Sequence, residues 1–244
     1  MMTRETGLRD SNDDTLWLVV PAAGKGTRMR AERPKQYLDL DGQPVIVHTL
    51  AKLHRAWPQA QLTLCLDEKD VWFEERFVPF DHWQRIDGGD ERADSVLNAL
   101  TALQGRAHAD DWVLVHDVAR PCVHVDDLHN LHASVIGDEV GGLLATPAAD
   151  TMKRQDRSQR VDHTESREGL WHALTPQAFR YGLLHEALHT ARQSGQTITD
   201  EASAIEAFGL APKLVPGRRD NLKITHPEDL ALARWIITAQ RDDT

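Results

Sequence analysis

The stretch LWLVVPAAGKGTRMRAERPKQY, residues 16–37, decides the fold of this chain. It begins with five apolar residues, a pattern typical of a strand that is buried on both faces of a parallel sheet. Pro21 ends the run, and the small residues Ala22-Ala23-Gly24-Lys25-Gly26 follow. Glycines let the backbone approach a ligand closely, and successive N–H groups can form an anion-binding nest. Because Arg28 and Lys35 add positive charge beside this turn, the stretch predicts a site for the phosphates of a nucleotide.

Two common phosphate-binding motifs do not fit this turn. The Walker A loop requires an additional glycine upstream of Gly24-Lys25-Gly26-Thr27, at a spacing that the chain lacks. The dinucleotide fingerprint requires a third glycine where Met29 stands, so a NAD-dependent dehydrogenase is poorly supported. A glycine pair after a strand is also common for packing alone, so the pair by itself is weak evidence.

The composition limits the classes of protein that the chain can belong to. Its 244 residues suit one α/β domain, which we expect over residues 16–244. The net charge of −10 argues against nucleic acid or an anionic membrane as a partner, so an anionic substrate must be held by local clusters of Arg and Lys. Residues 1–15 are polar and lack the apolar core of a secretory signal, so we expect a polar tail there. Cys65 and Cys122 are too few for a disulfide framework or a zinc cluster, so we expect a reducing, cytoplasmic location.

Apolar runs and helical patterns alternate along the rest of the chain. Strands are expected at residues 16–20, 62–66, 83–87, 113–115, 141–146, 170–174 and 214–215. Helices are expected after Pro44, over residues 68–79, after Glu91, around residues 128–135 and 184–191, over residues 199–208 and from Pro227. This order predicts an α/β, Rossmann-like three-layer sandwich with a mostly parallel sheet. Ligands of such sheets bind at the carboxyl ends of the strands, where Gly24, Gly89 and Asp117 all fall.

Residues 147–169 interrupt the alternation with a segment that is charged in both signs and has few core-forming residues. One interpretation is a disordered surface loop. The other is an extended β-hairpin arm that protrudes from the body and packs on another subunit, because long structureless loops are uncommon in compact domains and usually carry function. The residues alone do not decide between the two.

The string His185-Glu186-Ala187-Leu188-His189 matches the zinc-protease pattern on a predicted helix. The apolar face of that helix is centred between Leu184 and Ala191, more than a right angle from both histidines. This geometry places His185, Glu186 and His189 toward solvent, which argues against a zinc centre.

Two other short motifs have an ordinary structural interpretation beside a functional one. The segment Gly88–Ser95 can be a turn followed by the acidic start of a helix. Asp117 can be a turn residue at a strand end, but Arg120 shares its turn, so a carboxylate and a guanidinium could serve one polar ligand.

The whole set of motifs carries a resemblance that no single motif carries. The run Pro-Ala-Ala-Gly-x-Gly-x-Arg from Pro21 to Arg28 resembles the signature loop of the sugar-phosphate nucleotidyltransferases, and Pro34–Tyr37 points to their cytidylyltransferase branch. Val118 departs mildly from the alanine of the branch. The other matches, in family order, are Gly88–Ser95, His116–Pro121, Asp150–Lys153, Arg167, Leu170–Gln177, Thr199–Ala202 and Asp220–Lys223.

The resemblance implies a role for each matching residue. Arg28 and Lys35 would bind the triphosphate and the leaving pyrophosphate, and Lys223 the reacting α-phosphate; these are the expected catalytic residues. The nucleotide would be bound by Pro21, Ala22, Ala23, Gly24, Gly26, Gly89, Asp90, Arg92 and Ser95. The acceptor would be bound by Asp117 and Arg120, and by Thr151 and Arg167 reaching across a homodimer. Mg²⁺ or another divalent cation would bridge the phosphates, with Asp117 as the expected metal ligand, directly or through water.

The implied reaction transfers a cytidylyl group from CTP to a polyol phosphate, 2-C-methyl-D-erythritol 4-phosphate, and releases pyrophosphate. Two alternatives stay open at this stage. A ribitol 5-phosphate cytidylyltransferase would share the CTP half of the site, and a nucleotide-sensing module would bind CTP without turnover.

Overall fold

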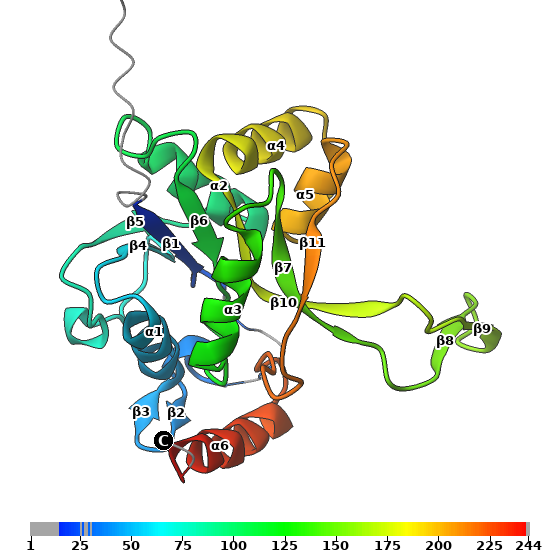
Figure 1. Ribbon diagram of the computed structural model, residues 1–244. Helices are drawn as coiled ribbons and strands as arrows, with labels where there is room; N and C mark the ends of the chain where they lie inside the picture. Colours follow the sequence, from blue (N-terminus) through cyan, green and yellow to red (C-terminus); the bar gives the residue numbers. More distant parts are fainter. Residues whose placement is uncertain (1–14, 25, 27–28, 30, 243–244) are drawn as a thin grey trace, which may run out of the picture.

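The computed structural model describes residues 15–24, 26, 29 and 31–242. A sheet of seven strands runs through the molecule in the order β11-β7-β10-β6-β1-β4-β5 (Figure 1). The strands are β1 (Leu16–Pro21), β4 (Gln61–Leu66), β5 (Trp83–Asp87), β6 (Trp112–Val115), β7 (Gly141–Pro147), β10 (Trp171–Arg180) and β11 (Lys213–Pro216). Neighbouring strands run parallel, except that β10 is antiparallel to both β6 and β7. The mostly parallel sheet was therefore predicted correctly.

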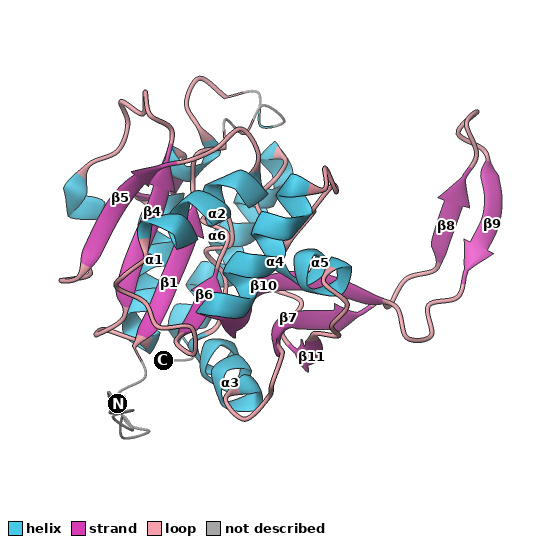
Figure 2. Ribbon diagram, turned by 90° about the horizontal axis from the view of Figure 1, so that it is seen from above, coloured by secondary structure: helices cyan, strands magenta, loops and turns pink. Residues whose placement is uncertain are grey.

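Helices cover both faces of the sheet, and the alternation of side chains along β1 decides which helices meet which residues. Leu18 and Val20 join the core formed with α1 (Val45–Ala56) and α3 (Val125–Val135). Trp17 and Val19 join the core formed with α2 (Arg92–Ala102), α4 (Tyr181–Gln193) and α5 (Glu201–Ala207). Figure 2 shows these layers from above. The three-layer α/β architecture is confirmed.

The last helix, α6 (Pro227–Asp242), lies beside the small hairpin of β2 (Asp39–Leu40) and β3 (Gln43–Pro44) (Figure 1). Its residues Ala233 and Ile237 share a third apolar cluster with Leu40 and Val45. Ile224 and Cys122 belong to the same cluster, so α6 fixes the chain that leads from β11 back toward the carboxyl ends of the strands.

Two predicted elements are corrected. Residues 68–79 form turns and one short 3-10 helix, Glu75–Phe77, rather than the expected helix. The Asp70 carboxylate explains the difference, because it accepts hydrogen bonds from the Trp72 and Phe73 amides and from the Tyr37 hydroxyl (2.6 Å). The strand expected to stop at residue 174 continues through Pro176 to Arg180, with an irregular register between Ala173 and Gln177.

The charged segment 147–169 is an extended arm. Strands β8 (Met152–Gln155) and β9 (Val161–Glu165) pair as a two-stranded hairpin that projects well away from the sheet (Figures 1 and 2). The structure thus shows the hairpin of the second interpretation, while its packing on another subunit stays a prediction.

Candidate active site

The loops that follow β1, β4 and β5 meet at the carboxyl ends of these strands. The Ala22 amide donates to the Cys65 carbonyl (2.8 Å), and the Gln36 side chain donates to the Ala22 carbonyl (2.7 Å). A Cβ atom on Gly88 would lie 2.3 Å from the Cβ of Ala23, so only glycine allows the β5 loop to approach the β1 loop this closely. The predicted nucleotide residues Pro21, Ala22, Ala23 and Gly24 thus share one edge of the sheet with Gly89 and Asp90.

Gly26 and Lys35 are in direct contact. Gly26 has a φ of +59°, and a Cβ atom there would lie 3.1 Å from Cγ of Lys35. The Lys35 ammonium donates to the backbone carbonyl of Ile224 (2.9 Å), which is 189 positions away in the chain. Lys35 is therefore held beside the predicted phosphate ligand Lys223. Arg28, the third predicted catalytic residue, lies outside the described residues.

Asp117, directly after β6 and His116, is the centre of the charged cluster. Its carboxylate accepts from Arg92 Nε (2.6 Å) and forms an ion pair with Lys223 Nζ (2.7 Å), while Arg120 Nε lies 3.7 Å away. Burial would raise the pKa of this carboxyl, but Arg92, Lys223 and Arg120 outweigh burial and hold its pKa well below the ordinary value. Asp117 is therefore a permanent anion that gathers three cations.

Glu201, at the start of α5, completes the cluster from the other side. Its two oxygens accept from the two terminal nitrogens of Arg92 at 2.7 and 3.0 Å, so the guanidinium is clamped between Asp117 and Glu201. Burial raises the pKa of Glu201, and Arg92 opposes this rise. The cations Arg92, Arg120 and Lys223 and the carboxylates Asp117 and Glu201 together have a net formal charge of +1, to which Lys35 adds another positive charge.

Backbone and neutral side chains hold this cluster in place. The Asp117 amide donates to the Thr175 hydroxyl (3.1 Å), which also contacts Nδ1 of the fully buried His116 (3.0 Å). Burial lowers the pKa of His116 to about 4, so its ring is neutral and serves as a support. The side-chain amide of Asn221 donates to the Thr175 carbonyl (2.8 Å), and Arg120 donates to the Asn221 carbonyl (2.7 Å).

Ser95 and Gly89 have a clear local role. The Ser95 hydroxyl accepts from the Gly89 amide (3.0 Å) and donates to the Glu91 carbonyl (3.2 Å). A Cβ atom on Gly89 would lie 2.2 Å from the Cβ of Asp94. These contacts fix the β5–α2 turn, and the predicted contact of both residues with a nucleotide stays a prediction.

A cavity of about 410 Å³ lies beside the cluster, toward the root of the arm. Arg120 and Lys223 line it, together with the arm residues Ala149 and Asp150. Its remaining lining residues are Thr146, Pro147, His172, Ala173, Leu174, Arg219, Asn221 and Leu222. The described lining includes neither Thr151 nor Arg167; both are exposed, and the Arg167 guanidinium donates to the Ala149 carbonyl.

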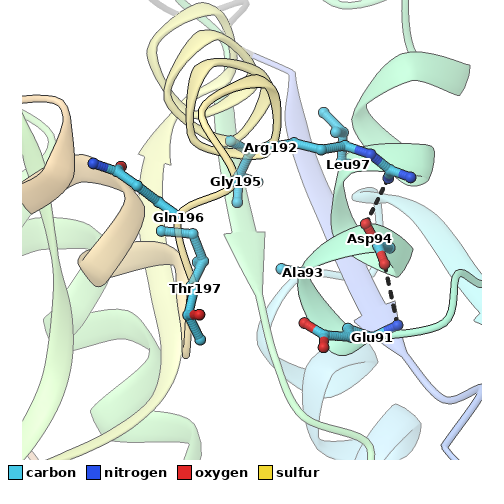
Figure 3. Close-up of a pocket in the computed structure, with 10 residues that line it drawn as sticks. Glu91, Ala93, Asp94, Leu97, Arg192, Gly195, Gln196 and Thr197 are labelled. Atoms are coloured by element: carbon cyan, nitrogen blue, oxygen red, sulfur yellow. Dashed lines mark hydrogen bonds and ion pairs between the residues drawn. The ribbon is translucent and has the colours of Figure 1, made fainter.

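A second cavity, of about 260 Å³, lies between the start of α2 and the end of α4 (Figure 3). Arg192 pairs there with Asp94 (2.5 Å), whose carboxylate also accepts from the Glu91 amide (3.2 Å). Asp94 and Glu91 form the capping box of α2. These contacts make the side chains of this cavity part of the support of α2, the helix that presents Arg92.

The described residues do not form a magnesium site of their own. No group of three or more His, Cys, Asp or Glu side chains placed to hold a metal occurs in the described part of the chain. The carboxylate of Asp117, the predicted metal ligand, already pairs with Arg92, Lys223 and Arg120, and its direct contact with a metal stays a prediction. On helix α4, Glu186 and His189 are exposed as predicted, whereas His185 is half-buried because its ring stacks on Tyr181.

Sequence reasoning missed Glu201, Thr175 and Asn221 as parts of the site, although all three lie in matched motifs. All three side chains are polar or charged and yet buried, and this combination is the signal that could have pointed to a role in the site. Their partners lie between 46 and 109 positions away in the chain, so no local pattern could pair them.

A glycine-rich loop at the carboxyl edge of a parallel sheet, beside convergent lysines and arginines, is typical of a nucleotide-binding α/β domain, and a family match makes the chain a nucleotidyltransferase. The family model described as "IspD: 2-C-methyl-D-erythritol 4-phosphate cytidylyltransferase" matches residues 16–239. The chain belongs to this family.

Individual relatives agree with the family match. A protein of Chromohalobacter salexigens named 2-C-methyl-D-erythritol 4-phosphate cytidylyltransferase is 63% identical, over 91% of this chain and 89% of that protein. One of the same name from Dechloromonas aromatica is 50% identical over 92% of this chain and 98% of its own length. A crystal structure described as 4-diphosphocytidyl-2C-methyl-D-erythritol synthase matches with a TM-score of 0.79 and 34% identity, over 91% of this chain and 98% of that one. The corresponding Francisella tularensis enzyme matches with a TM-score of 0.78 and 32% identity, over 91% and 99%.

Proposed function

We propose that the cation cluster around Asp117 catalyses the reaction of this family in isoprenoid biosynthesis, cytidylyl transfer from CTP to 2-C-methyl-D-erythritol 4-phosphate. The products are the CDP-alcohol and pyrophosphate. The observation that carries the proposal is the meeting of Lys35 and Lys223. Lys35 is hydrogen-bonded to the residue next to Lys223, and Lys223 is paired to the buried Asp117, so two cations from opposite ends of the chain face one edge of the sheet.

For this reaction the protein must position the two substrates and provide positive charge, and it does not need to transfer a proton. An oxygen of the acceptor phosphate, already an anion, attacks the α-phosphorus of CTP, and the bond from that phosphorus to the β-phosphate oxygen breaks. Two anions must therefore approach in line, and fixed positive groups lower the cost of this approach. We assign Lys223 to the α-phosphate, and Lys35 and Arg28 to the β- and γ-phosphates that leave as pyrophosphate.

The carboxylates direct the cations. Asp117 holds Lys223 at 2.7 Å, which restricts the lysine side chain before any substrate arrives. Arg92 is held at three nitrogens, so we assign it a positioning role for Asp117 in addition to its predicted contact with the nucleotide. Such preorganisation is how charged groups lower a barrier without moving during the reaction.

The nucleotide half of the site is formed by the loops after β1 and β5. We assign the backbone of Ala22, Ala23, Gly24 and Gly26 to the phosphates, and the turn at Gly89 and Asp90 with Ser95 to the base and ribose. Mg²⁺ prefers phosphate oxygens and few carboxylates. Since Asp117 is occupied by cations, we propose that the divalent cation enters as part of the substrate, Mg·CTP.

The acceptor half is the 410 Å³ cavity beside Arg120 and Lys223. We assign Asp117 and Arg120 to the polyol, and propose a homodimer in which Thr151 and Arg167 on the arm of a second copy reach the acceptor phosphate. The arm extends away from its own sheet, which supports an action outside its own chain (Figures 1 and 2). No helix of the described residues is long and apolar enough to cross a membrane. Both cysteines are buried and unpaired, and we infer a cytoplasmic location from them.

The test is a parallel assay of pyrophosphate release. CTP and Mg²⁺ are offered with 2-C-methyl-D-erythritol 4-phosphate, with ribitol 5-phosphate, and without acceptor. We expect release with the first acceptor only. Release with ribitol 5-phosphate alone would give the acceptor assignment to the alternative enzyme, and CTP binding without release from either would identify a nucleotide sensor.

A further inference from the structure

Arg219 is a cation on the rim of the acceptor cavity that the residues around it do not neutralise. Within the described part of the chain, its side chain makes no hydrogen bond or ion pair, and it is exposed. Its neighbour Arg218 provides a contrast, because it faces Asp126 (3.5 Å) and Asp127 (3.9 Å) on α3 and does not line the cavity. Arg218 therefore forms ion pairs with α3, whereas Arg219 lines the cavity without an ion pair among the described residues.

The floor of the same cavity contains polar atoms whose hydrogen-bonding capacity is not satisfied by the described residues. Nε of Arg120 and Oδ1 of Asn221 are buried without a hydrogen-bond partner among the described residues, and both residues line the cavity. Buried polar groups of this kind are nearly always satisfied in the working state of a protein. A ligand with a hydroxyl group could donate to the Asn221 oxygen, and one of its oxygens could accept from Arg120. The cavity thus has a floor for a polyol and a rim for an anion.

The charges on the rim decide which end of the ligand lies where. Lys223 is paired to Asp117, and Arg120 is close to the same carboxylate, so both cations are partly neutralised. Arg219 keeps its full charge, and a guanidinium binds the oxygens of a phosphate through two parallel hydrogen bonds. The acceptor's phosphate must also stay within reach of the α-phosphate beside Lys223, which lines the same cavity.

We propose that Arg219 binds the phosphate of the acceptor from the same subunit and determines the affinity of the enzyme for that substrate. This inference rests on the proposed function. In this inference the acceptor phosphate has ligands from both subunits. Thr151 and Arg167 come from the arm of the second copy, and Arg219 comes from the chain that also provides Lys35 and Lys223. The side-chain Oδ1 of Asn221 then accepts a hydrogen bond from a hydroxyl of the polyol on the floor of the cavity.

The test compares steady-state constants of the wild type, Arg219→Ala, Arg219→Lys and Arg218→Ala. Loss of one charge-assisted hydrogen-bonding group predicts a roughly 10–100-fold rise in KM for 2-C-methyl-D-erythritol 4-phosphate in Arg219→Ala. We expect the KM for CTP to change by less than about twofold, because Arg219 lines the acceptor cavity and the loop residues assigned to the nucleotide do not. Arg219→Lys keeps the positive charge but loses the two parallel hydrogen bonds of a guanidinium, so its KM for the acceptor should lie between those of the wild type and Arg219→Ala. Arg218→Ala should keep the wild-type KM for the acceptor.

Three outcomes separate the possibilities. An unchanged acceptor KM in Arg219→Ala overturns the inference, and so does an equal rise in the KM of both substrates. Absence of pyrophosphate release from the wild type with this acceptor would instead refute the proposed function. Melting temperatures of the wild type and the two Arg219 variants should agree, since Arg219 makes no contact among the described residues whose loss would destabilise the fold.

Discussion

A single residue, Asp117, shows how the site balances its charges. A buried carboxylate is costly unless cations compensate for it, and here Arg92 and Lys223 do so at 2.6 and 2.7 Å. The compensation also fixes the cations, which are the groups that the proposed mechanism uses. Single substitutions around Asp117 should therefore separate effects on turnover from effects on stability.

Lys35→Ala should lose turnover and keep the fold. Lys35 is half-buried, and its hydrogen bond to Ile224 goes to a neutral backbone carbonyl, so losing that bond should cost the fold little. By analogy with loss of one oxyanion-hole donor, kcat should fall ~10²–10³-fold. The measurement is pyrophosphate release, with circular dichroism to monitor the fold. Lys213→Ala, on the distant strand β11, is the matched control and should keep the wild-type rate; near-normal turnover of Lys35→Ala would remove Lys35 from the mechanism.

Glu201→Gln should affect stability first. The change removes the negative partner of the terminal nitrogens of Arg92 while keeping the shape of the side chain. Removing one partner of a buried pair costs ~3–5 kcal/mol, and we expect the lower end because Asp117 still pairs with Arg92. Urea unfolding measures the loss, and Glu206→Gln on the exposed face of α5 is the control. If both variants unfold at the same urea concentration, the Arg92 clamp does not stabilise the fold.

At the scale of elements, the end of β6 should make stability depend on pH. Burial lowers the pKa of His116 from 6.5 to about 4 in the folded protein. Between these values the unfolded chain binds a proton that the folded protein rejects, so stability falls as the pH drops from 6.5 toward 4. The shift corresponds to about 3 kcal/mol. Burial also lowers the pKa of His48, which adds to the effect, while the raised pKa of Glu201 opposes it.

The variant that isolates this contribution is His116→Gln. Its unfolding free energy, measured in urea at several pH values between 4 and 7, should vary less steeply with pH than that of the wild type. His82→Gln, at an exposed position just before β5, is the matched control and should keep the wild-type slope. An unchanged slope in His116→Gln would mean that the ring of His116 takes up its proton in the folded state as easily as in the unfolded chain.

The elements also show where a sequence is sufficient and where it is not. The strands around β1 were predictable because an apolar run buried on both faces leaves a continuous local signal. The segment 68–79 was not, because Asp70 caps its amides and binds Tyr37 through contacts that no periodicity reveals. The same holds in the site. Lys35 was recognisable in a local loop motif and Asp117 at a strand end, whereas Glu201, the partner of Arg92, is 109 positions away from it.

At the scale of the whole molecule, the arm is the feature that a single chain does not explain. A two-stranded hairpin is marginal in water unless something else covers it. Strands β8 and β9 pair with each other alone, and Val161 is 63% exposed. A homodimer in which each arm packs on the other subunit would cover the hairpin and bring Thr151 and Arg167 to the second acceptor cavity.

Mixed dimers test whether the arm acts on its partner. Lys35→Ala and Arg167→Ala should each be inactive or nearly so as homodimers. If Arg167 serves the other subunit, a dimer of one copy of each variant has one site with both residues and one site with neither. Heterodimers purified through two different tags should then recover about half of the wild-type rate. If each arm served its own chain, every site in the heterodimer would lack one residue, and no activity would return. A wild-type chain that runs as a monomer in solution would refute the shared site at once.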